Sequence, residues 1–272
     1  MSEDRIVETR RHGRVLEIVM NRPPANAVNR AMSRAIYAAL RELQDDVDLS
    51  VGVITGTGER IFSAGWDLKE LASDGYDPAL DADPVHGNGP GGFAGITEFY
   101  DLYKPVIAAV NGAAIGGGFE IVLSCDVVVM ADNAYYALPE MQRGFLADAG
   151  AIQRLPRRIP YNVAVEMMLT GRPMDANEAK GWGLAHDVVP QNQLAARALE
   201  MAKEVSKGAP LAMQALKGVL REIQTLSIED ALALTKPGQS GLEIYEKMVQ
   251  SDDFMEGPKA FAEKREPQWT GR

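Results

Sequence analysis

Short runs of β-branched and apolar residues recur in the first half of the chain, and helix-like stretches separate them. Residues 51–56, 105–110 and 126–130 are runs of this kind. Such runs are typical of strands that are buried on both faces of a parallel sheet. Because strands alternate with helices, the pattern favours right-handed βαβ units, and we predict an α/β fold.

Two further segments extend this pattern toward the N-terminus, and helical patterns replace it toward the C-terminus. Residues 15–20 form a strand-like run that ends in Asn-Arg-Pro-Pro, and residues 29–43 read as an amphipathic helix. From about residue 190 the strand signals stop. Helical patterns then cover residues 194–207, 210–224, 228–234, 240–250 and 257–265. A helical tail after an α/β core predicts a smaller second unit.

Composition excludes several classes of protein. The 272 residues are 46% hydrophobic and 24% charged, with a net charge of −10, so a general nucleic-acid binder is not expected. One cysteine and three scattered histidines offer no metal-ligand spacing, and we predict no metal site. No segment reaches the roughly 18 apolar residues of a membrane span, and no apolar signal core follows the first residues. We therefore expect a cytoplasmic protein without a membrane partner.

Residues 73–95 interrupt the pattern with a stretch rich in aspartate, glycine and proline. A loop of this length in a compact domain is usually functional or mobile. A lid over a site and a solvated surface excursion both fit the sequence.

Two glycine-containing turns each precede a predicted helix, at residues 61–70 and 111–120. Helix N-termini leave free N–H groups with partial positive charge. Two such groups that converge form an oxyanion hole, as a reaction through a thioester enolate requires. Close packing of helix on strand explains the glycines equally well. The spacing does not match a dinucleotide-binding or phosphate-loop motif.

Glu120 follows the triple-glycine turn directly, and Glu140 follows a leucine–proline pair. Both carboxyls have apolar neighbours in the sequence. Two carboxyls brought together suit paired acid and base catalysis, whereas capping of a helix start is the structural alternative. Cys125 lies between apolar runs and is expected to pack as a small hydrophobe.

Four motifs together carry a resemblance to a known family. They are Phe-Ser-Ala-Gly-Trp-Asp-Leu at 62–68, Lys-Pro-Val-Ile-Ala-Ala-Val-Asn-Gly at 104–112, Gly-Gly-Gly-Phe-Glu at 116–120 and Leu-Pro-Glu at 138–140. In this order they resemble the enoyl-CoA hydratase/isomerase (crotonase) superfamily, from about residue 10 to the end. Within it, residues 63–69, 89–95, 256–258 and 261–267 are most similar to the branch that interconverts crotonobetainyl-CoA and carnitinyl-CoA.

The resemblance implies a crotonase-like spiral of ββα turns with a helical C-terminal trimerisation region. Residues 1–205 would form the spiral core with the CoA and active sites, and residues 206–272 the oligomerisation region. The chain would act as a homotrimer or as a hexamer built from two trimers. No cofactor is implied, since coenzyme A enters as part of the substrate.

By motif position, the resemblance also assigns roles to individual residues. Glu120 and Glu140 take the places of the catalytic glutamates, and the amides of Trp66 and Gly117 those of the oxyanion hole. The expected CoA-binding residues are Ala64, Asp67, Leu68, Phe261 and Lys264. The two tail residues would reach CoA from a neighbouring subunit, within a tail whose Lys259, Lys264 and Arg265 make it locally basic.

The stretch after the second glutamate departs from the hydratase pattern Pro-Gly-x-Gly-Gly. Here it reads Ala147-Asp148-Ala149-Gly150-Ala151. An aspartate at the position of Asp148 resembles the carnitine-type members, whereas Ala147 and Ala151 depart more widely from the pattern. A quaternary ammonium group is recognised by aromatic faces and nearby negative charge. Phe93 and Asp148 are therefore the acyl-pocket candidates, beside Trp66.

The expected activity is reversible hydration of a 2-enoyl-CoA, with crotonobetainyl-CoA and carnitinyl-CoA as the expected pair. A general fatty-acyl enoyl-CoA hydratase and an enoyl-CoA isomerase would use the same residues. A non-catalytic acyl-CoA-binding protein is the alternative outside enzymes, although a binder needs neither Glu120 nor Glu140. The sequence leaves open the acyl group, the direction of flux, trimer or hexamer, and which glutamate activates water.

Overall fold

The computed structural model describes residues 6–75, 77–81 and 83–272, and it contains two sheets. The larger sheet has six strands in the order β1-β2-β3-β5-β7-β10. Only β1 and β2 pair antiparallel, while the other neighbours are parallel. These strands are β1 (Val7–His12), β2 (Val15–Met20), β3 (Val51–Gly56), β5 (Val106–Val110), β7 (Val127–Ala131) and β10 (Asp187–Val189).

The smaller sheet consists of very short strands in the order β4-β6-β8-β9. They are β4 (Ile61–Ser63), β6 (Ala113–Ile115), β8 (Tyr135–Ala137) and β9 (Met174–Asp175). Each ββα turn gives one strand to each sheet, as β3 and β4 do before α2 and β5 and β6 do before α4. The sequence pattern predicted β2, β3, β5 and β7 but no strand of the smaller sheet, because three residues are too few to show a period.

The remaining helices and single helical turns connect and cover these sheets. The helices of the core are α1 (Arg30–Asp45), α2 (Leu68–Asp74), α3 (Pro78–Asp81), α4 (Gly117–Ser124), α5 (Ala151–Arg154), α6 (Tyr161–Thr170), α7 (Ala176–Gly181) and α8 (Leu194–Val205). The 3-10 turns are η1 (Phe93–Gly95), η2 (Glu140–Arg143), η3 (Leu155–Arg157), η4 (Gln191–Gln193) and η5 (Ile223–Thr225).

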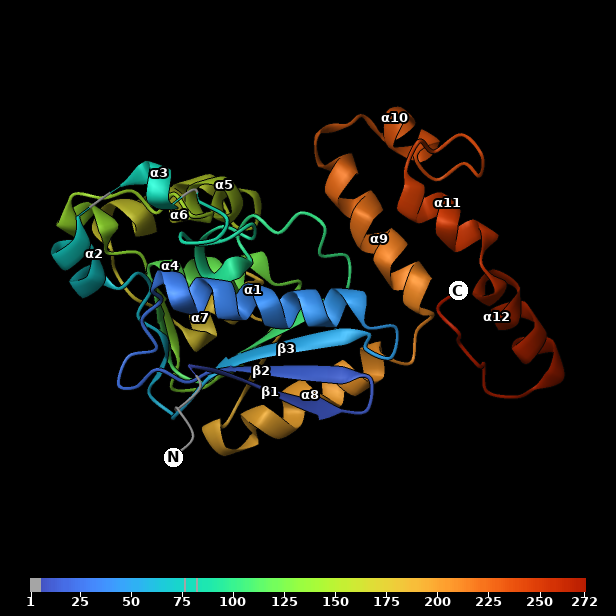
Figure 1. Ribbon diagram of the computed structural model, residues 1–272, viewed down its shortest axis with the longest axis horizontal. Coiled ribbons are helices and arrows are strands. Elements are labelled where there is room, and N and C mark those ends of the chain that lie inside the picture. The colour runs from blue at the N-terminus through green and yellow to red at the C-terminus, as the bar shows by residue number, and fades with distance from the viewer. Residues whose placement is uncertain (1–5, 76, 82) are drawn as a thin grey trace.

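Helices α1 and α8 cover opposite faces of the larger sheet (Figure 1). Asn29 caps α1, because its side chain accepts a hydrogen bond from the amide of Met32. Gly52 lets α1 approach β3 closely, since a methyl group there would lie 2.7 Å from Leu43 Cδ2. β1 was not predicted, because an edge strand exposes charged side chains and lacks an apolar run.

The last part of the segment 73–95 lies along α1. The Ser33 hydroxyl donates to Asn88 Oδ1 at 3.1 Å and accepts from the Ala94 amide at 3.0 Å. The Arg34 guanidinium donates to the carbonyls of His86 and Gly87. Residues 86–95 are therefore fixed to the core and are not a solvated excursion. Residues 76 and 82 of this segment lie outside the described residues.

Beyond α8, the chain leaves the sheets and forms an arm of helices at the right of Figure 1. The helices of the arm are α9 (Pro210–Glu222), α10 (Ile228–Ala233), α11 (Glu243–Gln250) and α12 (Asp252–Glu263). α12 starts five residues before the predicted start at 257, and Pro258 lies inside it. Proline lacks the amide hydrogen, and its ring crowds the preceding turn, so its place within a helix costs one hydrogen bond and bends the helix locally.

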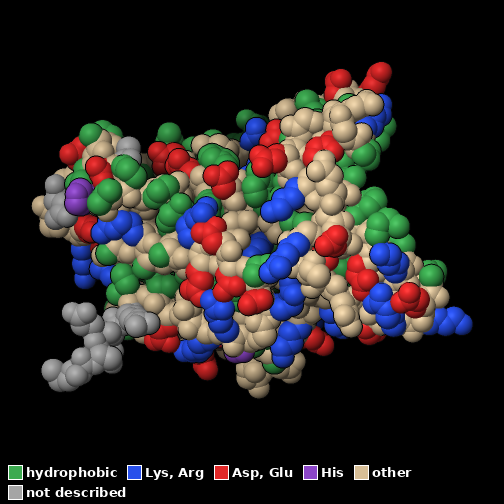
Figure 2. All heavy atoms as spheres, turned by 45° about the vertical axis from the view of Figure 1, so that its right-hand side comes forward, with side chains coloured by type: hydrophobic (Ala, Val, Ile, Leu, Met, Phe, Trp, Pro, Cys, Tyr) green, Lys and Arg blue, Asp and Glu red, His purple; other side chains and the backbone are tan. Residues whose placement is uncertain are grey.

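Hydrophobic side chains remain exposed along this arm, and some are visible at the right of Figure 2. They include Leu216, Leu220, Ile228, Leu232, Phe254, Met255 and Phe261, the last of which is 88% exposed. Exposed hydrophobic side chains gathered on one part of a chain are typical of interaction surfaces.

Candidate active site

The two glycine turns predicted from the sequence meet in space. Gly65 has φ +81°, and a methyl group there would lie 2.6 Å from the carbonyl of Ile115 and 2.7 Å from the amide nitrogen of Gly117. Only glycine accommodates both the positive φ and this approach. The amide of Gly117 is at the start of α4, where no partner within the helix exists. The structure thus places the Gly117 amide beside the Gly65–Trp66 turn.

Aromatic rings contact each other or the glycine turns in this part of the chain. The Phe93 ring lies against Gly117, because a methyl group on Gly117 would meet Phe93 Cε1 at 2.5 Å. The Trp66 and Phe145 rings meet edge to face, with centroids 6.1 Å apart. Phe93 therefore supports the glycine turn, while Phe145, which the sequence analysis did not single out, joins Trp66.

Glu120 lies in the first turn of α4 and is 3% exposed. Its Oε1 accepts a hydrogen bond from the amide of Ala151 at 3.0 Å, at the start of α5. Burial raises the pKa of Glu120 to about 7, and the charges of Glu140 and Asp148 act in the same direction. A carboxyl with this pKa can give and take a proton near neutral pH.

Glu140 begins η2 and points back to the start of α4. A methyl group on Gly116 would lie 2.5 Å from Glu140 Oε1, so this carboxyl lies beside the residue that precedes Gly117. Its Oε2 is buried, and among the described residues it has no hydrogen-bond partner. Burial raises the pKa of Glu140 as well. The structure therefore brings both glutamates to the N-terminus of α4.

Asp148 is exposed, and its charge raises the pKa of both glutamates. It is thus close enough to influence the site electrostatically. At Ala151, one of the two departures from the hydratase pattern, the backbone amide donates to Glu120 Oε1. The glycine that the hydratase pattern expects is not needed for that hydrogen bond.

The three predicted CoA residues of the first turn have different surroundings. Ala64 is half-buried, and Leu68 is 40% exposed at the start of α2. Asp67 is buried, caps α2 through the amides of Lys69 and Glu70, and forms an ion pair with Arg22 at 2.6 Å. Although burial opposes ionisation, Arg22 and the two amides hold the pKa of Asp67 below its ordinary value. The Asp67 carboxylate thus already has partners within the fold.

Phe261 and Lys264 lie on the arm, away from the glutamates of the same chain. Figure 1 shows α12 at one end of the molecule and α4 and α5 toward the other. Lys264 ends α12 in the left-handed conformation. Arg265 forms ion pairs with Glu256 and Glu263, so the tail is less basic than its sequence suggested.

Metal-ion chemistry and cysteine chemistry find no support in the described residues. No group of three or more histidine, cysteine, aspartate or glutamate side chains there could hold a metal ion. Cys125 is buried, and burial raises the pKa of its thiol to about 12, so it packs as predicted. No helix within the described ranges is long and apolar enough to cross a membrane.

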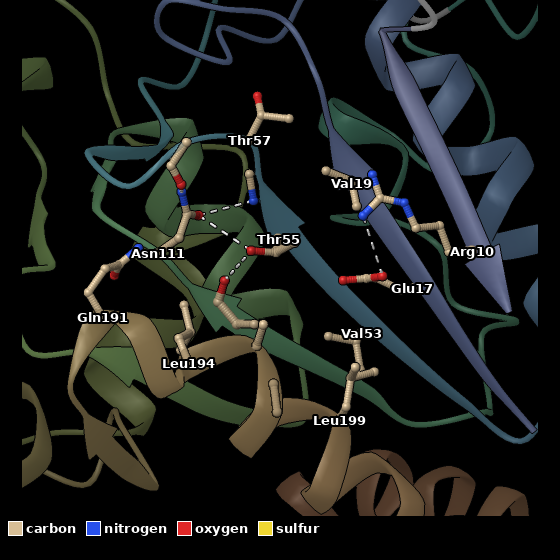
Figure 3. Close-up of a pocket in the computed structure, with 15 residues that line it drawn as sticks. Arg10, Glu17, Val19, Val53, Thr55, Thr57, Asn111, Gln191, Leu194 and Leu199 are labelled. Carbon is tan, nitrogen blue, oxygen red and sulfur yellow. Dashed lines mark hydrogen bonds and ion pairs between the residues drawn. The ribbon is translucent and has the colours of Figure 1, made fainter. Parts of the chain in front are cut away.

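A hollow of about 250 Å³ lies between α8 and the larger sheet (Figure 3). Val53 and Leu199 line its apolar part, and Thr55 and Asn111 its polar part. The Thr55 hydroxyl already donates to the Ala109 carbonyl, and Asn111 Oδ1 accepts from the Gly56 amide. Neither glutamate lines this hollow, so it is separate from the candidate active site.

Comparison with known proteins identifies the family of this chain. The model of the enoyl-CoA hydratase/isomerase family matches residues 10–272. The chain belongs to the enoyl-CoA hydratase/isomerase family. A carnitinyl-CoA dehydratase of Proteus mirabilis is 47% identical over 272 residues and covers 100% of both chains. The predicted family and the crotonase-like α/β fold are thereby confirmed.

Solved structures of the enoyl-CoA hydratase/isomerase family agree with the fold. An enoyl-CoA hydratase of Mycobacterium tuberculosis superposes with a TM-score of 0.86 at 36% identity, over 98% of this chain and 99% of that one. A carnitinyl-CoA hydratase of Mycobacterium avium gives 0.73 at 38% identity, with the same coverage. Both matches cover the helical arm as well as the core.

Sequence reasoning missed two residues at the site, Phe145 and Arg154. Phe145 follows Gly144, which takes the left-handed conformation, five residues after Glu140. An aromatic residue so close to a candidate glutamate was the available signal. Arg154 had no such signal, because its contacts lie 57 residues away at Thr97.

Proposed function

We propose that this chain catalyses the reversible hydration of a 2-enoyl-CoA thioester. One observation carries the proposal: the carboxyls of Glu120 and Glu140 both lie at the N-terminus of α4, where the Gly65 turn touches the Gly117 amide. An acyl-CoA-binding protein without catalysis would need no buried pair of carboxyls with raised pKa values.

In the proposed reaction, the amides of Trp66 and Gly117 hold the thioester oxygen as it gains charge. Each such donor contributes about 3 kcal/mol in comparable oxyanion holes. One glutamate activates a water molecule for attack at C3, and the other passes a proton to C2. In dehydration each group acts in reverse at the same atom: the second glutamate takes the proton from C2, and the first protonates the hydroxyl that leaves C3. Coenzyme A enters as part of the substrate, and the proton transfers require no further cofactor.

We propose crotonobetainyl-CoA and carnitinyl-CoA as the substrate pair. The similarity to carnitinyl-CoA dehydratases supports this choice. The trimethylammonio group forms no ordinary hydrogen bond and is recognised by aromatic faces and negative charge. The ring pair of Trp66 and Phe145, together with the exposed carboxylate of Asp148, offers both. Phe93 lies against Gly117 and remains the other aromatic candidate for this pocket.

We further propose that the protein acts in the cytoplasm as a homotrimer or a pair of trimers. The exposed hydrophobic side chains of the arm support association between copies. In such an assembly Phe261 and Lys264 of one copy would reach the CoA of another. A small acyl-CoA is the expected ligand, and the net charge of −10 argues against a nucleic acid.

A comparison of crotonobetainyl-CoA with crotonyl-CoA tests the proposal. The cationic head is expected to raise kcat/KM about five- to thirty-fold, the equivalent of about 1–2 kcal/mol. Asp148→Asn should reduce this preference, because the negative charge beside the ammonium group is lost. Asp132→Asn, at an exposed turn, is the matched control.

Two results would contradict parts of the proposal. If crotonyl-CoA is the better substrate of the unaltered protein, a general enoyl-CoA hydratase replaces the carnitine-type assignment. If neither thioester is hydrated, dehydrated or isomerised, the acyl-CoA-binding alternative holds.

A further inference from the structure

Arg154 is the last residue of α5, and its half-buried guanidinium contacts two separate segments of the site. Nη2 donates to the carbonyl oxygen of Thr97 at 2.5 Å. Nη1 lies over Gly150, since a methyl group added there would come within 1.9 Å of this nitrogen. One side chain therefore joins the residue before α5 to the segment after η1.

Thr97 connects Arg154 to the glycine turn through Phe93. It is 2% exposed, and its hydroxyl and amide both donate to the carbonyl of Phe93, at 3.0 and 3.4 Å. The Phe93 ring lies against Gly117. Arg154 is thus connected through two residues to the place where the Gly117 amide meets the Gly65 turn.

On its other side, Arg154 is connected to Glu120. The amide of Ala151, at the first position of the same short helix, donates to Glu120 Oε1 at 3.0 Å. A helix of four residues is not stable by itself, so tertiary contacts set its position. The guanidinium provides such a contact at the C-terminal end of α5.

The groups around Glu120 act in opposite directions on its ionisation. Burial, Glu140 and Asp148 disfavour the charged form of Glu120, while the Ala151 amide and Arg154 favour it. Besides Glu120, Arg154 faces the phenol of Tyr100, the guanidinium of Arg158 and the thiol of Cys125. Burial lowers the pKa of Arg154, yet a guanidinium stays protonated at any pH at which the enzyme works.

We propose that Arg154 is a positioning residue for the hydration reaction: it holds the Ala151 amide on Glu120 and the Phe93 segment against Gly117, without touching the substrate. This inference rests on the proposed function, because it requires Glu120 to act as an acid–base group.

Three variants separate the geometry from the charge. Arg154→Met removes both and should lower kcat about tenfold to a hundredfold with little change in KM. It should also move the Glu120-dependent limb of the pH–rate profile to higher pH, because loss of a nearby positive charge raises the pKa of a carboxyl. Arg154→Lys keeps the charge but loses the contact with both segments. We therefore expect kcat to fall, while the Glu120-dependent limb stays at its wild-type pH. Arg157→Met is the control, since Arg157 is exposed and donates to the carbonyl of Gln153.

The outcomes also distinguish the inference from the proposed function. Normal turnover of Glu120→Gln would remove the proposed function and this inference with it. If Glu120→Gln is inactive while Arg154→Met matches Arg157→Met in kcat and in its pH limb, the positioning role alone is wrong. If Arg154→Met does not fold, Arg154→Lys decides: a lower kcat at unchanged KM supports the role, and wild-type kcat overturns it.

Discussion

At the residue scale, the two glutamates differ in how they are held. Glu120 accepts a backbone amide hydrogen bond, which favours its charged form. Glu140 has a buried Oε2 without a hydrogen-bond partner among the described residues. Glu140 therefore keeps an unmet hydrogen-bond acceptor at the site, whereas Glu120 Oε1 is already paired with the Ala151 amide.

Removal of either carboxyl should slow turnover strongly without weakening substrate binding. Glu120→Gln and Glu140→Gln are each expected to lower kcat by about two to four orders of magnitude, because both act on one water. For the same reason, the double variant should be little worse than either single variant. Steady-state kinetics with crotonobetainyl-CoA measures this. Near-normal kcat in one variant would remove that residue from the mechanism.

The stability of Glu120→Gln provides a check on folding. Because the pKa of Glu120 is raised from 4.5 to about 7, the folded protein binds more protons than the unfolded chain between these values. The contribution of Glu120 to stability is therefore greatest below pH 4.5 and is lost as the pH rises through about 7. Glutamine has no charge to bury, so the variant should unfold at a higher temperature than the wild type above pH 7.

At the element scale, the approach of the Gly65 turn to α4 defines the predicted oxyanion hole. β4 and β6 are adjacent parallel strands of the smaller sheet, so the turns that follow them come out at the same edge. Gly65 and Gly117 then let the backbones touch. The predicted oxyanion hole thus depends on backbone separation more than on side-chain identity.

Gly65→Ala should damage catalysis, because its methyl group would collide with the Gly117 amide at 2.7 Å. We expect kcat to fall about a hundredfold, as for loss of one oxyanion donor. Gly58→Ala is a matched control, since Gly58 has the same φ of +81° but nothing within 4 Å of an added methyl group. It should lose about 1 kcal/mol of stability from strain and keep its kcat. Equal kcat values for both variants would argue against an oxyanion hole at this turn.

At the scale of the whole molecule, the helical arm leaves several hydrophobic side chains exposed. α11 packs on α9, while Leu216 and Leu220 on α9 remain 60% and 51% exposed. The chain end folds back on the arm, because Asp253 accepts from the amides of Thr270 and Gly271. Truncation of the tail would therefore disturb the arm itself, and point substitutions are the cleaner test.

Substitution of Leu216 and Leu220 by lysine should dissociate the proposed oligomer. Each leucine would lose about 1.5–3 kcal/mol of burial at an interface between copies. Affinity for CoA should fall together with the mass of the assembly if Phe261 reaches a neighbour. Light scattering and a CoA titration measure the two effects, with Val85→Lys on the core as the control, since Val85 is also exposed. An unchanged mass would show that this face of α9 is not part of the interface.

The sequence alone determined the α/β core, four of the five long strands, α1 and the helical arm. These elements have strong local signals: apolar runs of five or six residues and helical stretches of six or more. The motifs also identified the family, and with it the ββα spiral that local patterns did not reveal. The candidate glutamates and glycines were found for the same reason, since each lies in a short motif.

Only the tertiary structure decided how these residues are surrounded. β4, β6 and β8 have three residues each and are stabilised by pairing with one another, which leaves no local period. The contact of Arg154 with Thr97 and the amide that Ala151 gives to Glu120 join segments 57 and 31 residues apart. Local propensity and patterning carry no information about such contacts, whereas burial and Coulomb interactions depend on distance in space. The raised pKa values of the glutamates are therefore properties of the fold, not of the motifs.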